Sequence, residues 1–384
     1  MNAPRSRPKN ATLKVAGLFA GIGGLELGLH AAGHKSQMLC EIEPGASAVL
    51  RNRFPKLQHV FDVRDVTKLP RGTSLLTAGF PCQDLSSSGH KSGISGSQSS
   101  LVDEVFRILE RNDVDWVLFE NVKFMLHLQG GRAMKRIATK FEQLGYRWAY
   151  RVLNTETFGL PQRRHRVYFL ASRAGDPRDV LLSNDEPFSQ RWPSVNEPIG
   201  FYWTEGAFST GLAANAVPPL KGGSTIGIPS PPAILDIGGM VGTPSIGDSE
   251  RLQGFPADWT LPAIEVARAS HRWKLVGNAV SVPVAEWVGR KLANPLSYDS
   301  SSDRPMGKKW PHAGWSVDGK RFESAVSDSP LGLQHCGLDK FVRDPLKPLS
   351  RRAIDGFLGR VAAGRLKYPD GFLSSLQRFR DSVA

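Results

Sequence analysis

Two side chains are suited to covalent and acid chemistry, Cys82 and Glu120. Cys82 follows Pro81 at the end of an apolar run and precedes residues 83–100, a polar stretch rich in Ser and Gly with the composition of a closing loop. A thiol placed there predicts an exposed nucleophile, although small buried cysteines that only fill a core are common as well. Glu120 ends another apolar run, where burial of a carboxyl raises its pKa and makes it a proton donor.

A glycine-rich turn near the N-terminus indicates a ligand that carries a ribose. Residues 19–24 read Phe-Ala-Gly-Ile-Gly-Gly and join an apolar run to an amphipathic stretch, so backbone amides can approach a ligand at a helix N-terminus. Glu41 follows Gly21 by 20 residues, where an acid can accept both ribose hydroxyls. The turn predicts an adenosine-type ligand, and its departure from G-x-G-x-x-G argues against nicotinamide. A turn that serves only the fold is the alternative.

A basic run, residues 162–166, precedes another apolar stretch. If the strand pattern extends through it, alternation places Arg164 and Arg166 on the same side of the chain, able to reach a carboxylate or a base carbonyl. A solvated basic loop is the alternative for either arginine taken alone.

The elements that must position these residues alternate between short apolar runs and amphipathic stretches from Leu13 to about Ser172. This pattern is typical of strands and crossover helices in an open parallel sheet, with the stripes at 101–109 and 134–141 packed on it. The sequence therefore predicts an α/β fold of the doubly wound, Rossmann-like type. We expect strands at 14–19, 37–41, 74–80, 115–121, 147–153 and 166–171.

The rest of the chain has a different texture, because residues 211–247 are rich in Gly and Pro. We expect an irregular, β-containing module at 173–248, a return to the first domain at 249–292, and a basic, partly helical C-terminal extension at 293–384. Ser350 and Asp370 are expected to cap helices in that extension. The first domain then spans 13–172, after a flexible basic segment at 1–12.

Composition limits the partners. The 384 residues have a formal net charge of +13 and a pI of about 9.8, which indicates a polyanion as partner. Three cysteines make no disulfide framework or zinc pair, and no apolar run is long enough for a membrane span or a signal peptide. We expect an intracellular, soluble protein with no metal and no membrane partner.

Taken together, the motifs resemble those of the cytosine-C5 DNA methyltransferases. The resemblance covers about residues 13–292 and rests on their order along the chain: 19–24, Glu41, Asp65-Val66-Thr67, Pro81-Cys82-Gln83, Glu120-Asn121-Val122, Gln162-x-Arg164-x-Arg166, 251–256 (Arg-Leu-Gln-Gly-Phe-Pro) and 277–280 (Gly-Asn-Ala-Val). No motif of the family covers the extension or most of the Gly/Pro-rich module.

The resemblance implies a reaction and a role for each residue. Cys82 adds to C6 of cytosine, so that C5 can attack the methyl group of S-adenosylmethionine, while Glu120, Arg164 and Arg166 stabilise the ring. The group that removes the C5 proton is not indicated. The residues implied for the cofactor pocket are Phe19, Gly21, Ile22, Gly23, Gly24, Glu41, Ile42, Asp65, Val66, Leu101, Asn278 and Val280. Among them, the resemblance assigns Glu41 to the ribose and Asp65 to the amino group of the adenine.

The same resemblance implies duplex DNA as substrate, because a stacked cytosine must rotate out of the helix before a thiol can reach it. Residues 83–100 are then the closing loop, and 173–248 the target-recognition region, with Lys221, Ser224 and Thr225 as candidate contacts. A cytoplasmic or nucleoid-associated enzyme is expected, and a cognate restriction endonuclease is a candidate partner that the sequence leaves open.

Three other classes of protein share some of these features. The RNA-directed branch of the family carries a Cys-Phe-Thr signature in its variable region, but no cysteine lies between Cys82 and Cys336 here. A catalytically silent DNA-binding regulator needs neither Cys82 nor Glu120. An amino-methylating DNA enzyme needs an Asn or Asp before Pro-Pro and an aromatic residue, which this chain lacks.

Overall fold

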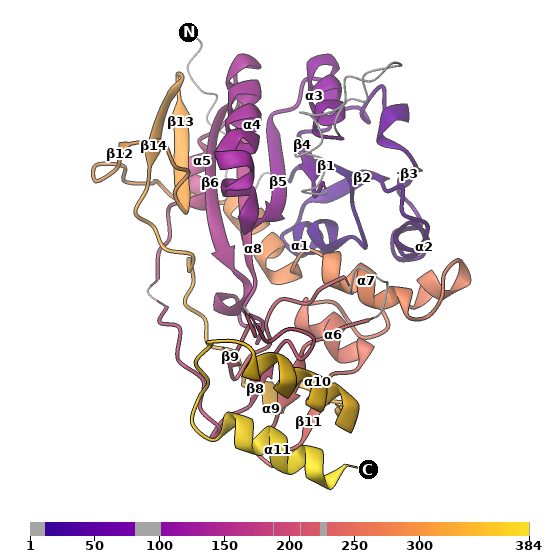
Figure 1. Cartoon of the computed structure of the whole chain (residues 1–384). Helices are drawn as coiled ribbons and strands as arrows, with labels where there is room; N and C mark the ends of the chain where they lie inside the picture. The colour runs from indigo at the N-terminus through magenta and orange to yellow at the C-terminus, as the bar shows by residue number, and fades with distance from the viewer. Residues whose placement is uncertain (1–11, 81–100, 187, 208, 223–228, 384) are drawn as a thin grey trace, which may run out of the picture. The chain divides into compact units, whose positions relative to one another are not determined.

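The computed structural model describes residues 12–80, 101–186, 188–207, 209–222 and 229–383. The chain divides into two compact units (Figure 1). Unit 1 consists of the described residues of 1–154, 165–187 and 280–331, and unit 2 of those of 155–164, 188–279 and 332–384. Each unit is therefore assembled from segments that lie far apart in the sequence.

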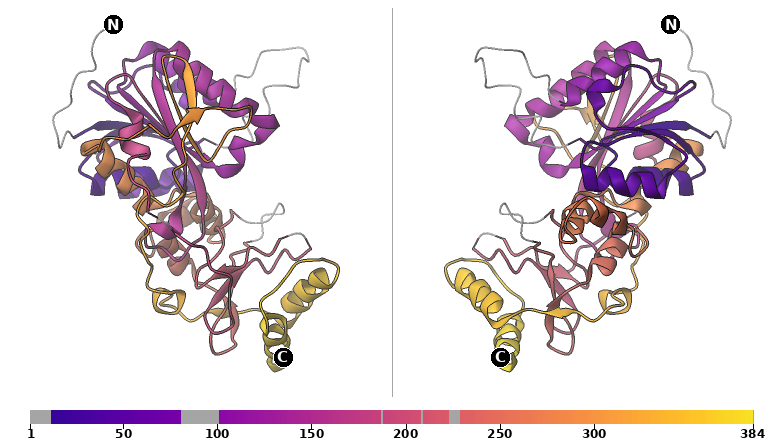
Figure 2. Two further views of the ribbon diagram at one scale, coloured as in Figure 1. Left: turned by 90° about the vertical axis from the view of Figure 1, so that its left-hand side faces the viewer. Right: turned by 90° about the vertical axis from the view of Figure 1, so that its right-hand side faces the viewer.

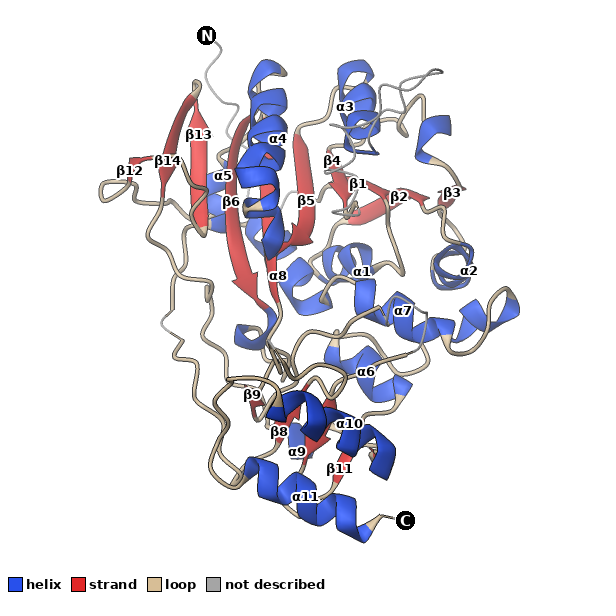
Figure 3. Ribbon diagram, in the orientation of Figure 1, coloured by secondary structure: helices blue, strands red, loops and turns tan. Residues whose placement is uncertain are grey.

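Unit 1 is built on a ten-stranded sheet in the order β12-β14-β13-β6-β7-β5-β4-β1-β2-β3 (Figure 3). The strands predicted from the sequence are all present, and the prediction of a Rossmann-like α/β fold is confirmed. The first half of the sheet is parallel and consists of β1 (Lys14–Leu18), β2 (Lys35–Cys40), β3 (Gln58–Val60), β4 (Leu75–Ala78) and β5 (Trp116–Val122).

The second half of the sheet is antiparallel, which the expected parallel pattern did not include. β7 (His165–Ser172) pairs antiparallel with both β5 and β6 (Arg147–Asn154). The connection between β6 and β7, residues 155–164, is shorter than the dozen or more residues that a parallel crossover needs. The remaining strands, β12 (Arg304–Pro305), β13 (Ala313–Val317) and β14 (Lys320–Glu323), extend the sheet beyond β6.

Helices cover both faces of this sheet (Figure 2). One core cluster joins the apolar stripes of α3 (Leu101–Arg111) and α4 (Arg132–Gln143) to alternate residues of the strands. On the other face α1 (Gly24–Ala31) packs closely against α8 (Val282–Ala293), since a Cβ at Gly28 would lie 2.6 Å from Ala285 Cβ. The helix expected to pack back onto the first domain is therefore α8. The other helices of unit 1 are α2 (Pro44–Arg53), α5 (Pro177–Leu181) and the 3₁₀ turns η1 (Val63–Asp65), η4 (Lys123–Leu126) and η5 (Leu128–Gly131).

Unit 2 contains a five-stranded antiparallel sheet in the order β15-β11-β10-β8-β9. Its strands are β8 (Ile199–Phe201), β9 (Ala213–Ala214), β10 (Ala233–Leu235), β11 (Val241–Thr243) and β15 (Lys347–Pro348). Its helices are α6 (Ile246–Leu252), α7 (His271–Asn278), α9 (Leu338–Phe341), α10 (Arg351–Ala362) and α11 (Phe372–Ser382), with 3₁₀ turns η6 (Thr155–Thr157) and η7 (Leu261–Glu265). The strands β8, β9, β10 and β11 lie within 173–248, the range expected for an irregular, β-containing module, whereas β15 comes from the C-terminal extension.

The C-terminal extension does not form a body of its own. Residues 293–331 belong to unit 1, where β13 pairs with β6, whereas residues 332–384 belong to unit 2, where β15 pairs with β11. Buried Phe357 of α10 and Phe372 of α11 complete the core over β8 and β10. Ser350 caps α10 by accepting a hydrogen bond from Ala353 N, as expected, but α11 begins after Gly371 without a side-chain cap from Asp370.

Across the described residues, every helix is too short or too polar to cross a membrane, and the same residues contain no group of His, Cys, Asp and Glu arranged to hold a metal ion.

Candidate active site

The carboxyl ends of the parallel strands bring the predicted residues of unit 1 to one edge of the sheet. Phe19, Glu41, Gly79 and Glu120 follow or end β1, β2, β4 and β5, which are neighbours in the sheet. A Cβ at Gly79 would lie 3.6 Å from the carbonyl oxygen of Phe19 and 3.9 Å from Glu120 Oε2. Open α/β sheets bind their ligands at this edge, and the glycine leaves room for one.

The glycine turn after β1 has one open and one packed position. Phe19, Gly21 and Gly23 all have positive φ angles, of 52°, 56° and 86°. A Cβ at Gly21 would meet nothing within 4 Å, whereas a Cβ at Gly23 would lie 2.6 Å from the ring of Phe54. Gly21 therefore faces space that a ligand can enter, and Gly23 is required by packing against Phe54.

Glu41 is fixed beside this turn by backbone amides. Its Oε2 accepts a hydrogen bond from Gly21 N at 2.8 Å, and its Oε1 accepts one from Glu43 N at 2.8 Å. Burial raises the pKa of Glu41 above its usual range, although the amides of Glu43 and Gly21 favour the carboxylate. An acceptor held at a fixed position next to an open glycine turn is suited to bind hydroxyl groups.

The other predicted cofactor residues of unit 1 differ in exposure. Ile42 is 50% exposed, Asp65 is exposed at the end of η1, and Leu101 is half-buried at the start of α3. Val66 is instead buried in the core. Ile22 and Gly24 are also buried where the turn enters α1.

Glu120 and Arg166, two of the predicted catalytic residues, lie in contact. Arg166 lies opposite Val122 in the β5–β7 register, and its Nε is 3.3 Å from Glu120 Oε1. Both side chains are largely buried, with exposed fractions of 16% for Arg166 and 9% for Glu120. The structure therefore brings this predicted pair together, and a buried guanidinium holds one oxygen of the carboxyl.

Asn121 has a role that the sequence alone did not indicate. Its Nδ2 donates to Phe80 O at 3.0 Å, and its Oδ1 accepts from Val122 N at 2.9 Å. Asn121 thus links the end of β5 to Phe80, which directly precedes Pro81 and Cys82. Cys82 and the loop expected at 83–100 lie outside the described residues.

Arg164 does not share the carboxyl with Arg166. β7 begins at His165, so the alternation expected for these two arginines does not extend to position 164. Arg164 belongs to unit 2 and is 1% exposed, and its guanidinium donates to three backbone carbonyls there. The acceptors are Leu220 O at 3.3 Å, Gly277 O at 3.2 Å and Ala279 O at 2.8 Å. These three contacts hold the backbone of unit 2, and the role predicted for Arg164 at the base stays a prediction.

The remaining predicted residues divide between the two units. Asn278 is exposed at the end of α7 in unit 2, and half-buried Val280 begins the last segment of unit 1. Of the candidate DNA contacts, Lys221 forms an ion pair with Glu205 and lies 3.7 Å from the ring centre of Tyr202, whereas Ser224 and Thr225 lie outside the described residues.

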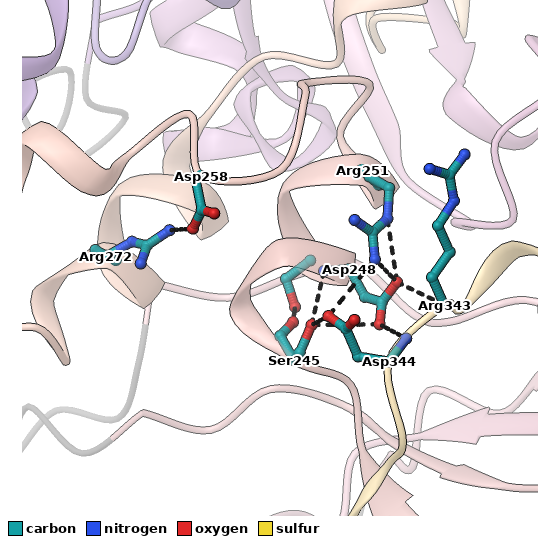
Figure 4. A network of polar contacts seen from close by, with 8 residues as sticks. Ser245, Asp248, Arg251, Asp258, Arg272, Arg343 and Asp344 are labelled. Carbon is teal, nitrogen blue, oxygen red and sulfur yellow. Dashed lines mark hydrogen bonds and ion pairs between the residues drawn. The ribbon is translucent and has the colours of Figure 1, made fainter.

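Arg251, the first residue of the motif at 251–256, belongs to a polar network in unit 2 (Figure 4). Arg251 Nε donates to Asp248 Oδ1 at 3.2 Å, and the fully buried carboxylate of Asp248 also accepts from Arg343 N at 2.9 Å and Asp344 N at 3.1 Å. Ser245 Oγ donates to Asp344 Oδ2 at 2.5 Å. The network joins the motif to a segment close to the C-terminus.

The sheet order, the glycine turn and the acid after β2 define a Rossmann-like methyltransferase fold, and solved structures share it. The Dnmt2 methyltransferase of S. pombe has a TM-score of 0.51 and 17% identity, and the match covers 73% of this chain and 97% of that one. The Entamoeba histolytica methyltransferase EhMeth has a TM-score of 0.51 and 15% identity, over 72% of this chain and 96% of that one. At these identities the likeness shows the fold.

Sequence comparison gives the family. The profile of the C-5 cytosine-specific DNA methylases matches residues 13–200. Type II methyltransferase M2.BsuMI of Bacillus subtilis (strain 168) is 46% identical over 96% of this chain and 98% of that protein. Type II methyltransferase M.NgoBI of Neisseria gonorrhoeae is 31% identical over 74% of this chain and 93% of that protein.

The chain therefore belongs to the C-5 cytosine-specific DNA methylases and is a DNA cytosine-C5 methyltransferase of the restriction-modification type. The family inferred from the motifs is confirmed.

Proposed function

We propose that this enzyme transfers a methyl group from S-adenosylmethionine to C5 of a cytosine rotated out of duplex DNA, through a transient bond between Cys82 and C6. One observation carries the proposal: Phe19, Glu41, Gly79 and Glu120 meet at the carboxyl edge of one sheet. Family membership supports the same chemistry. Asn121 donates a hydrogen bond to the carbonyl of Phe80, and Cys82 comes two residues after Phe80.

The residues of unit 1 fit S-adenosylmethionine. Glu41 presents a carboxylate, fixed by two amides, that can accept ribose hydroxyls. The open side of Gly21 leaves space for the methionine end, while exposed Ile42 and half-buried Phe19 offer apolar surface to the adenine. The bound cofactor supplies an electrophilic methyl group on a sulfonium.

The chain's own residues then act on the pyrimidine. The Cys82 thiolate adds to C6, and Glu120, in its protonated form, donates to N3 and neutralises charge that builds on the ring. Arg166 orients Glu120 through the contact at 3.3 Å. C5 gains the methyl group and loses its proton to a base, and the electrons of the C5–H bond re-form the C5–C6 double bond and expel the Cys82 sulfur by elimination. The proton on N3 returns to Glu120 in the same step.

Arg164 is a positioning residue in this proposal. Its three carbonyl contacts hold the backbone at 277 and 279, on either side of Asn278. The family pattern links Asn278 to the cofactor, so we propose that Arg164 positions the backbone beside Asn278.

Unit 2 is proposed to read the DNA sequence. Duplex DNA as substrate requires that the target base leave the stack, at a cost of about a few kcal/mol. The net charge of +13 favours binding to phosphates. A cognate restriction endonuclease and a cytoplasmic, nucleoid-associated location complete the proposal, and methylation of a random DNA library read by bisulfite sequencing would identify the site.

A trapping experiment tests the covalent step. Duplex DNA with 5-fluorocytosine at the target position, mixed with enzyme and methyl donor, should give an adduct that survives denaturation, because fluorine blocks the proton loss that releases Cys82. The variant Cys82→Ser should give no adduct. Its matched control, Cys336→Ser, removes an exposed cysteine of unit 2 and should trap as well as the wild type.

A wild-type enzyme that methylates cytosine in DNA but forms no adduct would overturn the covalent mechanism. Methyl label that enters transfer RNA and not duplex DNA would overturn the substrate. A Cys82→Ser variant with full activity would leave the thiol without a role.

A further inference from the structure

Arg107 of α3 is bonded to the backbone of the segment that carries Asp65. Its Nη2 donates to Val63 O at 3.2 Å, to Arg64 O at 3.4 Å and to Val66 O at 3.0 Å. The side chain is 24% exposed, so most of the guanidinium is shielded from water. One cation thus contacts three carbonyls within a segment of four residues.

That segment is a single 3₁₀ turn, capped at its start by Asp62, whose Oδ1 accepts a hydrogen bond from Arg64 N at 2.9 Å. η1 has three residues, and its internal backbone bonds are Asp65 N to Asp62 O at 3.1 Å and Val66 N to Val63 O at 3.2 Å. A single 3₁₀ turn is weakly held by such bonds, and its carbonyls need external donors. Arg107 supplies them, whereas Asp65 itself projects into solvent. The direction of the Asp65 side chain therefore depends on where Arg107 holds the backbone.

Arg107 is itself held in place before any ligand binds. Glu104, three residues earlier on α3, has its Oε2 at 2.6 Å from Arg107 Nε, and Glu104 is 11% exposed at its side chain. The ion pair orients the guanidinium so that Nη2 faces the carbonyls. A donor fixed in this way loses little conformational entropy when it makes its bonds.

We propose that Arg107 is a positioning residue for cofactor selectivity, which places the Asp65 carboxylate where it meets the amino group of the adenine. The inference rests on the proposed use of S-adenosylmethionine, because Asp65 is the residue that the family pattern assigns to that amino group. It adds a residue on another element, α3, as the cause of the recognition. α3 also begins with Leu101, so one helix would carry both a wall of the pocket and the support of its polar contact.

Selectivity for the amino group is the property to measure. Titration calorimetry, without turnover, would compare the binding of two ligands, S-adenosylhomocysteine and S-inosylhomocysteine. In the second ligand, oxygen replaces the adenine amino group. A site built to bond a polar group rejects an analogue that lacks it, by at least about tenfold. Arg107→Met should weaken the binding of S-adenosylhomocysteine about tenfold and that of S-inosylhomocysteine less than about threefold. The ratio of the two affinities should then fall towards one.

Arg136→Met is the matched control. Arg136 Nη2 contacts both carboxylate oxygens of Asp103 on α3, at 2.5 Å and 2.6 Å, so the control also removes an arginine bound to that helix. None of its described contacts reaches 63–66, and the preference for the adenosyl ligand should remain. Asp65→Asn should lower the preference as Arg107→Met does, and combining the two should add no further loss of selectivity.

Each outcome is decisive. An unchanged ratio in Arg107→Met, or an equal loss of both ligands, would show a purely structural arginine and overturn the inference while leaving the proposed function intact. A wild type that binds neither ligand would overturn the proposed cofactor. If Arg107→Met does not fold, Arg107→Lys, which keeps the charge with a single donor group, should show an intermediate ratio, and a wild-type ratio in that variant would overturn the inference.

Discussion

Replacing Glu26 with glutamine should stabilise this methyltransferase at pH 8 and change little at pH 5. Glu26 lies on α1 and is completely buried, and its Oε1 accepts a hydrogen bond from Thr77 Oγ1 at 3.3 Å. A Cβ at Gly17 would collide with the same oxygen, so the carboxyl is packed directly on β1. Burial raises the pKa of Glu26 to about 7, and the charge of Glu41 adds to the effect.

The sign and size follow from the two protonation states. In the unfolded chain the pKa of this carboxyl is 4.5. Between pH 4.5 and about 7 the unfolded chain releases a proton that the folded protein keeps, so stability falls as the pH rises. At 1.36 kcal/mol per pH unit the loss above pH 7 amounts to about 3 kcal/mol. Glutamine keeps the bond to Thr77 and carries no charge at either pH.

Urea unfolding followed by tryptophan fluorescence at pH 5 and pH 8 measures the effect. The variant minus wild-type free energy of unfolding should stay below about 1 kcal/mol at pH 5 and reach about 3 kcal/mol at pH 8. Glu110→Gln, at an exposed position of α3, is the control and should show no such difference. A difference for Glu26→Gln that is equal at both pH values, or larger at pH 5, would refute the reasoning.

Three further predictions concern packing and capping. Arg164→Met should lower the stability of unit 2 by about 3 kcal/mol or more, seen as a shift in its urea midpoint, because buried carbonyls lose a charged donor. Ser350→Ala should cost about 1 kcal/mol, since the bond to Ala353 N caps α10, and Ser350→Asp should restore it. Gly28→Ala should lower the melting temperature, at a cost of about 1–3 kcal/mol, because its Cβ would lie 2.6 Å from Ala285 Cβ, whereas Gly33→Ala would meet no atom within 4 Å and adds only backbone strain.

The core strands could be predicted because each carries its own local signal. β1, β4 and β5 are short apolar runs bounded by polar or glycine-rich residues, and the stripes of α3 and α4 repeat at helical spacing. Ser350, as a typical N-cap residue, likewise predicts the start of α10. Parallel strands present their carboxyl ends at one edge, so the chain positions of Glu41 and Glu120 were enough to expect them in one site.

Contacts between distant segments could not be predicted in this way. β13 reaches β6 across more than 150 residues, and the segment after Gly332 completes the core of unit 2, so no local signal divides the extension at 293–384 between two units. Asn121 and Arg107 act through backbone carbonyls, which carry no sequence signature.

Arg164 and Arg166 show the difference between what the sequence determines and what the tertiary structure decides. The order of residue types along the chain determined the family, the strands of the first domain and the residue types of the site, because periodicity and motif spacing are properties of neighbouring residues. The contacts of Arg164 and Arg166 were decided by tertiary structure, since β7 starts between them. The guanidinium of Arg166 contacts Glu120, and that of Arg164 contacts carbonyls of unit 2. A side chain's partner depends on which distant segment folds against it, and that is set by the packing of the whole unit.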